Sequence, residues 1–201
     1  DDLFKKVSAA CEPLWVPRKD ITFSIYGRTM ALPRDKAFLG LYLMVSTAAA
    51  LCPLYRYSTY KPVTHSWRGT IIEAIAEALT GITGFAFNHV VVNRYQDGKD
   101  YIGPHHDKTR DLAPGAPIVT VSLGAPRTMA LTPAKAYTHL PTFREVLAPG
   151  SAYVLGYDTN ATHKHAIPKS ATIKTTTKTT TTTTTTSHTE ARISLTFRCV
   201  A

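Results

Sequence analysis

The spacing of apolar residues changes near residue 86, and this change constrains the fold more than any other feature of the chain. From there on, apolar and polar residues alternate, which predicts strands whose successive side chains face opposite sides of a sheet. Glycine-containing pairs at 97–98, 114–115 and 149–150 separate these runs and are typical of turns. The pattern predicts a mainly β fold, a sandwich or a barrel-like jelly roll, with helices mainly before the strands. The predicted strands are residues 87–95, 118–124, 128–132, 152–157 and 192–199.

The N-terminal part favours helices. Residues 70–82 give the clearest one, because their isoleucine and leucine residues recur at helical spacing and Thr70 with Glu73 forms a capping box. Residues 35–51 also look helical, whereas residues 21–30 alternate enough for a strand. Residues 37–54 carry no charge and reach the lower edge of a membrane-spanning length. Their serine, threonine, proline and four alanines favour a buried helix instead.

Composition sets the broad class of protein. The 201 residues favour one domain with a sizeable core, and the net charge of +9 favours a polyanionic partner, nucleic acid first, over a merely solvated basic surface. The three cysteines show no zinc spacing and no disulfide framework, which fits a reducing compartment. No secretory pattern is visible at the N-terminus.

The pair His105 and Asp107 carries the strongest chemical signal. In an extended segment these two side chains project to the same face, while His106 points away. Two histidines and one carboxylate form the facial triad of non-haem Fe(II) oxygenases, which leaves three coordination positions open, although zinc would accept the same donors. The third ligand must be His139, His163, His165 or His188. We select His165, because the short apolar run and Pro168 that follow it resemble a strand end.

The last predicted strand divides its side chains between two faces. Ile193, Leu195 and Phe197 face one side, and the other side carries Arg192, Ser194, Thr196 and Arg198. Buried guanidiniums need an anion, and an arginine can bind a carboxylate with two parallel hydrogen bonds. The strand therefore predicts a site for a dicarboxylate co-substrate, unless one of the arginines pairs with a carboxylate of the protein.

Asn93 and Tyr95 also share a face and could add hydrogen bonds to such a ligand.

Together these residues resemble the AlkB family of Fe(II)/2-oxoglutarate dioxygenases, which demethylate nucleic acids, and within it the eukaryotic members that repair duplex DNA. The resemblance rests on NRYxxG from Asn93, HxD from His105, a later histidine followed by a small residue and a proline, and RxxxTxR from Arg192. It covers about residues 14–28 and 53–199. Further similar stretches are 16–19, 55–58, 111–127, 147–155 and 191–198.

The resemblance implies a double-stranded β-helix (jelly roll) with an N-terminal nucleotide-recognition lid, divided as residues 1–69 and 70–201. It implies Fe(II), 2-oxoglutarate and O2 as cofactors, with ascorbate as reductant in assays. It also implies demethylation of 1-methyladenine and 3-methylcytosine in DNA, and a nuclear, monomeric protein. The implied iron ligands are His105, Asp107 and His165. The implied 2-oxoglutarate contacts are Asn93, Tyr95, Arg192 (at the distal carboxylate), Ser194 and Arg198. The implied nucleic-acid contacts are Arg18, Lys19, Tyr55, Tyr57, Thr109 and Lys169.

Three features depart from the family pattern. Thr109 stands where the family usually has an acidic residue that reads the amine of the base. Residues 29–52 are an insertion, and residues 170–190 form a threonine-rich segment that we expect to be a flexible loop. RNA or a protein side chain therefore remains an alternative substrate, and a non-catalytic nucleic-acid binder is a third hypothesis.

Overall fold

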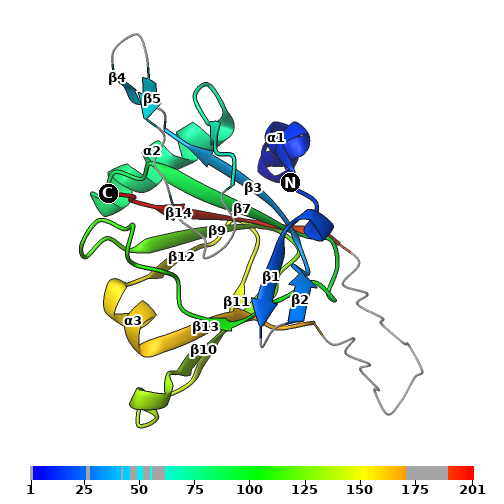
Figure 1. Cartoon of the computed structure of the whole chain (residues 1–201), viewed down its shortest axis with the longest axis vertical. Coiled ribbons are helices and arrows are strands. Elements are labelled where there is room, and N and C mark those ends of the chain that lie inside the picture. Colours follow the sequence, from blue (N-terminus) through cyan, green and yellow to red (C-terminus); the bar gives the residue numbers. More distant parts are fainter. Residues whose placement is uncertain are drawn as a thin grey trace, which may run out of the picture.

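Two antiparallel sheets dominate the protein in its computed structural model, which describes residues 2–25, 28–41, 43–45, 49–51, 55, 62–170 and 190–201. The larger sheet has the strand order β12-β9-β14-β7-β3-β6 and the smaller sheet β11-β10-β13-β8, and only the β3–β6 pair is parallel. Helices α1 and α2 lie on one side of the larger sheet and the smaller sheet lies on the other (Figure 1). The mainly β, jelly-roll prediction is confirmed.

The helical elements are α1 (Asp2–Cys11), η1 (Glu12–Leu14), η2 (Arg18–Asp20), α2 (Ile71–Thr83), η3 (Lys135–Tyr137) and α3 (Tyr157–Thr162). The strands are β1 (Thr22–Ile25), β2 (Arg28–Ala31), β3 (Asp35–Gly40), β4 (Leu43–Val45), β5 (Ala49–Leu51), β6 (His65–Ser66), β7 (His89–Tyr95), β8 (Ile102–His105), β9 (Ile118–Gly124), β10 (Arg127–Pro133), β11 (Phe143–Leu147), β12 (Ala152–Leu155), β13 (His163–Ile167) and β14 (Arg192–Arg198).

Strand β14 lies in the middle of the larger sheet, paired with β7 on one edge and β9 on the other. Its apolar side chains Ile193, Leu195 and Phe197 are fully buried in the core cluster beneath α1 and α2. Its polar side chains face the opposite way, toward the smaller sheet. The division of this strand into an apolar and a polar face is therefore confirmed.

Helix α2 forms where the sequence predicts it. The Thr70 hydroxyl accepts a hydrogen bond from the backbone N–H of Ile72, and the Glu73 carboxylate accepts one from Gly69, so two groups at the helix start are satisfied. Gly84 ends the helix in the left-handed conformation, φ 75°, and donates to the carbonyl of Thr80.

The five predicted strands appear as β7, β9, β10, β12 and β14. Residues 118–124 match β9 in full, whereas β12 ends at Leu155 because α3 begins at Tyr157. Residues 21–30, predicted as one strand, instead contain β1 and most of β2, which pair with each other in antiparallel register. Strands β8, β11 and β13 were absent from the prediction.

The predicted helix at 35–51 is wrong. Residues 35–40 form β3, which pairs in antiparallel register with β7, and β4 and β5 follow as a second hairpin. Every residue of β3 is buried, so its apolar run reflects a strand covered on both faces. Among the described residues, no helix combines the length and apolarity needed to cross a membrane. Residues 171–189 lie outside the described residues, so the loop expected there stays a prediction.

Candidate metal and co-substrate site

A cavity of about 550 Å³ lies between the two sheets, and both contribute side chains to it. The polar face of β14 forms one wall together with residues of β3, β7 and β9. Strands β8 and β13 of the smaller sheet form the opposite wall. All predicted metal and co-substrate residues line this cavity: His105, Asp107 and His165, with Asn93, Tyr95, Arg192, Ser194 and Arg198.

The pairing of β8 with β13 brings the two histidines together. His105 lies directly opposite His165 in the register, and their ring centroids are 4.3 Å apart. The Oδ1 atom of Asp107 is 3.7 Å from Nε2 of His105 and 4.0 Å from Nε2 of His165. One ligand atom from each residue lies within 4.8 Å of the others, so the three side chains could hold one metal ion.

The protonation states also suit a metal. Burial lowers the pKa of His105 and lowers that of His165 to about 4, so both rings are neutral at physiological pH and can offer a nitrogen lone pair. Burial opposes the ionisation of Asp107, but the charge of Arg198 foremost outweighs it and holds the pKa of that carboxyl well below its usual range. The competing candidate His163 approaches the carbonyl of Pro141 at 3.1 Å instead.

Asn160 of α3 fixes the backbone beside the metal carboxylate, a role that the sequence did not reveal. Its Oδ1 accepts from the backbone N–H of Asp107, and its Nδ2 donates to the carbonyl of Asp107, both at 2.9 Å. Its own carbonyl lies 2.5 Å from Nδ1 of His106. Because α3 leads directly into β13, Asn160 ties the loop that carries Asp107 to the strand that carries His165.

Arg192 supplies a deep anion-binding group at the other end of the same strand face. It is 1% exposed, its Nη2 donates to the Ser122 hydroxyl at 2.9 Å, and its guanidinium carbon lies 5.1 Å from the ring centroid of Tyr95. Its Nε and Nη1 have no hydrogen-bond partner among the described residues. A buried guanidinium with two unsatisfied nitrogens fits a bound carboxylate. Ser122 was missed, since a serine in a strand carries no distinctive signal.

Arg198 binds a carboxylate of the protein. Its Nη2 is 2.6 Å from Oδ2 of Asp107. Arg198 is therefore the arginine of this strand that pairs with a protein carboxylate, the alternative considered above. Asn93 is also engaged, because its Oδ1 accepts from Nε of Arg34 at 3.0 Å. Arg34, directly before β3, and Lys36, within β3, also line the cavity. Neither was among the predicted site residues, since a helix was predicted from residue 35 on.

The expected nucleic-acid contacts fall into different settings. Tyr55 lines the cavity but is only 3% exposed, with its ring 4.5 Å from the guanidinium carbon of Arg198. Thr109 does not line the cavity. Lys169 lies 5.0 Å from the ring centroid of Tyr101, which does line it. Lys19 is exposed, and Tyr57 lies outside the described residues.

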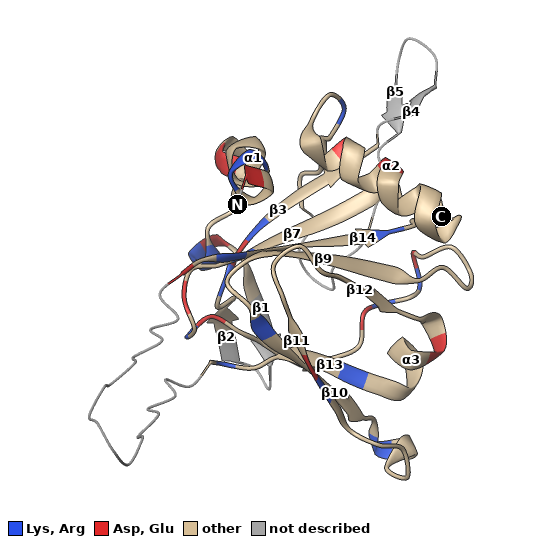
Figure 2. Ribbon diagram, turned by 180° about the vertical axis from the view of Figure 1, so that it is seen from behind, with Lys and Arg blue, Asp and Glu red and all other residues tan. Residues whose placement is uncertain are grey.

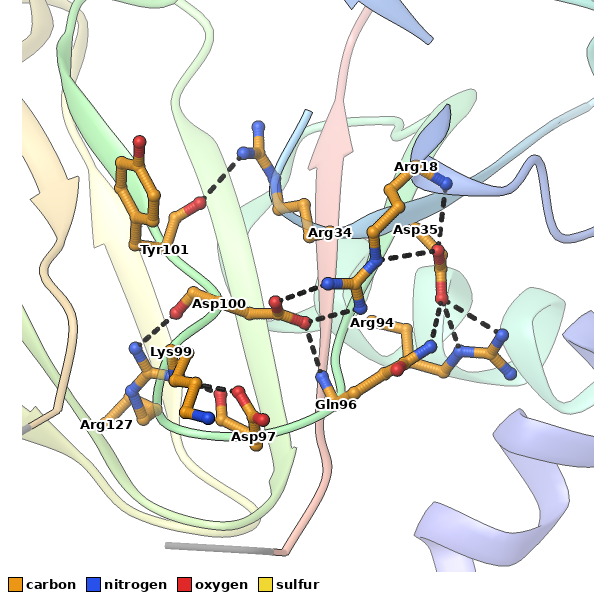
Figure 3. A network of polar contacts seen from close by, with 10 residues as sticks. All are labelled: Arg18, Arg34, Asp35, Arg94, Gln96, Asp97, Lys99, Asp100, Tyr101 and Arg127. Atoms are coloured by element: carbon orange, nitrogen blue, oxygen red, sulfur yellow. Dashed lines mark hydrogen bonds and ion pairs between the residues drawn. The ribbon is translucent and has the colours of Figure 1, made fainter. Parts of the chain in front are cut away.

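Arg18 belongs to an internal ion-pair network (Figure 3). Both terminal nitrogens of its guanidinium donate to Asp100, at 2.7 and 2.9 Å, and its backbone N–H donates to Asp35. Arg127 holds the same loop from the other side through the carbonyls of Asp97 and Asp100. The network fixes the loop that leads into β8, and its contacts occupy the groups with which Arg18 would meet a phosphate.

Comparisons with known proteins agree with this geometry. The sequence model of the 2OG-Fe(II) oxygenase superfamily matches residues 26–198. The human protein named DNA oxidative demethylase ALKBH2 is 34% identical over 149 residues, which are 72% of this chain and 53% of that protein. ALKBH2 of Arabidopsis thaliana is 28% identical over 92% of this chain and 59% of its own length.

The chain thus spans about half the length of the curated relatives that it matches. A more distant relative, alpha-ketoglutarate-dependent dioxygenase alkB homolog 3 of Rattus norvegicus, is 27% identical over 73% of this chain and 46% of its own length. The solved structure of OsALKBH1 superposes with a TM-score of 0.57 at 17% identity, covering 98% of this chain and 92% of that one. At that identity the likeness concerns the fold.

Proposed function

The chain belongs to the 2OG-Fe(II) oxygenase superfamily, and on that premise we propose that it removes methyl groups oxidatively from nitrogen atoms of DNA bases. One observation carries the proposal: the three candidate iron ligands and the unsatisfied guanidinium of Arg192 face the same cavity. The expectation of an AlkB-like enzyme that uses Fe(II) and 2-oxoglutarate is confirmed by the family and by the matched relatives.

His105, Asp107 and His165 would hold Fe(II) on one face and leave the remaining positions open. When bound there, Fe(II) and 2-oxoglutarate supply the oxidation of a substrate C–H bond by O2, with succinate and CO2 as the co-products. The two neutral imidazoles donate lone pairs, and Arg198 keeps the Asp107 carboxylate ionised and oriented.

Arg192 would hold the distal carboxylate of 2-oxoglutarate through its Nε and Nη1 atoms, while Ser122 keeps the guanidinium in place. The guanidinium of Arg192 lies against the ring of Tyr95. The path from the distal carboxylate to the metal would be lined by Tyr95, Asn93 and Ser194. The enclosed position excludes water from the charged contacts, which strengthens them.

The DNA relatives and the basic surface support a DNA substrate. Lysines and arginines are spread over both sheets (Figure 2), and Lys108, Arg110 and Lys169 are exposed on segments beside the cavity. Such residues supply affinity for the phosphate backbone. A methylated base that cannot pair is cheaper to extrude, and it must leave the stack to reach a metal inside a cavity. Tyr55, with Tyr57 near it in sequence, is proposed to stack on the extruded base.

The reaction on the substrate is hydroxylation of the N-methyl carbon. The resulting N-hydroxymethyl group breaks its C–N bond, which releases formaldehyde and restores the base. Within this proposal, 1-methyladenine and 3-methylcytosine are the first substrates to test, the protein is a nuclear monomer, and the β1–β2 hairpin is the nucleotide lid. Met30 and Leu32, which line the cavity from this hairpin and its end, support the lid.

The test is formaldehyde release from duplex oligonucleotides that carry one methylated base, with Fe(II), 2-oxoglutarate and ascorbate present. Mass spectrometry of the oligonucleotide should show the loss of one CH2 per turnover, and Asp107→Ala should show none. RNA and methylated peptides in the same assay examine the alternative substrates, which the threonine at position 109 motivates. Turnover of a peptide with none of DNA would overturn the proposal.

A further inference from the structure

The cavity between the sheets carries an excess of positive charge. Among the described residues that line it are five arginine or lysine side chains and one carboxylate: Arg34, Lys36, Lys108, Arg192 and Arg198 against Asp107. Bound Fe(II) and the 2-oxoglutarate dianion would cancel one another and leave this excess unchanged. The charge therefore acts on whatever base enters.

Arg198 and Arg192 each have an anionic partner in the loaded site. Arg198 pairs with Asp107 at 2.6 Å, and Arg192 would receive the distal carboxylate of 2-oxoglutarate. Arg34 differs from both. It is 4% exposed, and among the described residues it donates hydrogen bonds to neutral acceptors, the amide oxygen of Asn93 at 3.0 Å and the carbonyl of Tyr101 at 3.1 Å. Its full charge therefore stays inside the cavity.

Lys36 responds to the positive potential at the same wall. It is 7% exposed and lies beside Asn93 in the β3–β7 register. Burial lowers its pKa well below the usual value, and the neighbouring charges of Arg34 and Arg198 lower it further. These neighbours would disfavour any further cation in the same space.

Methylated bases divide into two classes by charge. A methyl group on N1 of adenine or N3 of cytosine is added to a ring lone pair and leaves the base cationic. A methyl group on N1 of guanine or N3 of thymine replaces a proton and leaves the base neutral. Each class contains one purine and one pyrimidine, so charge can be compared at matched ring size.

We propose that this cavity selects the uncharged N-methyl bases, 1-methylguanine and 3-methylthymine, over the cationic 1-methyladenine and 3-methylcytosine. The selection rests on the function proposed above. It works because the positive charge of the cavity repels the cationic bases. A unit charge several ångströms away in a partly buried site changes an affinity by roughly tenfold or more. The threonine at position 109 supplies no opposing carboxylate.

The first experiment measures binding without turnover, under nitrogen with Mn(II) and 2-oxoglutarate bound. Fluorescently labelled duplexes carry 1-methylguanine or 1-methyladenine in one sequence context, and 3-methylthymine or 3-methylcytosine in another. We expect the neutral member of each pair to bind about tenfold more tightly. A ratio at or below one in either pair overturns the proposal.

Charge variants separate electrostatics from base shape. Arg34→Gln keeps hydrogen-bond donors toward Asn93 and Tyr101 but removes a charge that arginine never loses, so it should shift both ratios about tenfold toward the cationic base. Arg34→Lys retains the charge and should leave them nearly unchanged. Lys108→Gln, at an exposed lysine that also lines the cavity, is the second charge-removal variant if Arg34→Gln does not fold. Equal ratios in wild type and a folded charge-removal variant contradict the mechanism.

The same duplexes distinguish the selection from the proposed function. If formaldehyde is released from none of them, the demethylase proposal fails, while the binding ratios still decide the charge selection. If the cationic bases are turned over and also bind more tightly, the demethylase proposal stands and the selection fails.

Discussion

Asn160 clamps Asp107 through both ends of its side-chain amide, accepting from the Asp107 backbone N–H and donating to the Asp107 carbonyl at 2.9 Å each. Asn160 is 2% exposed, so these bonds are shielded from water. The contact joins two metal-ligand segments that lie nearly sixty residues apart in sequence.

The first prediction concerns this clamp. Asn160→Ala should weaken Mn(II) binding by about 10–100-fold, the effect typical of lost supporting contacts around a metal ligand. The free energy of unfolding of the metal-free protein should fall by about 1–3 kcal/mol, because the backbone N–H and carbonyl of Asp107 lose their partners. Asn160→Asp keeps the side-chain acceptor and loses the donor, so its Mn(II) affinity should lie between those of the wild type and Asn160→Ala. An unchanged affinity in Asn160→Ala would show that β8 and β13 alone position the carboxylate.

Loss of a metal ligand should abolish activity and leave the fold. We expect His105→Ala to retain the far-ultraviolet circular dichroism of the wild type, bind Mn(II) at least 100-fold more weakly and release no formaldehyde. His163→Ala is the matched control, because His163 contacts the carbonyl of Pro141 and lies on the same strand as His165. Full activity of His105→Ala would contradict the ligand assignment.

Substitution of the two arginines of β14 should affect ligand binding in different ways. Arg192→Met removes the deep guanidinium and should raise the Kd of 2-oxoglutarate by roughly 10–100-fold, since a charge-assisted hydrogen bond contributes about 1.5–3 kcal/mol. Its Mn(II) affinity should stay near that of the wild type. Arg198→Met should weaken the binding of both Mn(II) and 2-oxoglutarate, because Arg198 holds the Asp107 carboxylate. Isothermal titration with each ligand separates the two outcomes, and identical profiles for the two variants would count against the assignment.

His89 should make stability depend on pH. It is fully buried, burial lowers its pKa to about 3, and neither ring nitrogen has a hydrogen-bond partner among the described residues. The unfolded chain binds a proton at this site near pH 6.5 and the folded chain does not. Stability is therefore complete above pH 6.5 and falls as the pH drops toward 3.

At pH 5 the loss from this residue is about 2 kcal/mol relative to pH 7.5. His89→Leu should reduce the fall in unfolding free energy between these two values by that amount in urea titrations. Other titrating groups are shared by both proteins and cancel in the comparison. An equal fall in both would mean that the ring is protonated in the folded state.

The Arg18–Asp100 pair should stabilise the fold rather than bind DNA. Arg18→Ala leaves the Asp100 carboxylate, whose side chain is 5% exposed, without its two-pronged partner, and should cost about 2 kcal/mol of unfolding free energy. Lys6→Ala removes an exposed ion pair with Asp2 and should cost less than about 0.5 kcal/mol. A large loss of DNA affinity at unchanged stability in Arg18→Ala would restore the phosphate-contact reading.

Much of the site could be predicted because its residues follow one another at a spacing of two. A strand turns Arg192, Ser194 and Arg198 to one side whatever it pairs with, and the same rule aligns Asn93 with Tyr95. His165 lies close to His105 and Asp107, and its strand ends two residues after it, at Ile167.

The parts that escaped prediction depend on tertiary partners. Residues 35–40 belong to the stretch predicted as helical, yet pairing with β7 overrides the helix preference of their alanine and leucine. Because this strand was not predicted, the positions of Arg34 and Lys36 in the cavity wall were not predicted either. Strand β8 contains Gly103 and Pro104, which read as a turn, and its pairing with β13 depends on a segment sixty residues away.

The central position of β14 has a consequence for synthesis of the protein. Until residues 192–198 have left the ribosome, β7 and β9 each present a row of unpaired backbone groups, and these rows invite pairing with other chains. Because the other thirteen strands that the structure describes precede β14 in sequence, the two parts of the larger sheet can join only after β14 has been synthesised. A chaperone that covers open strand edges would act before that point, and it would no longer be needed at this sheet once β14 is inserted.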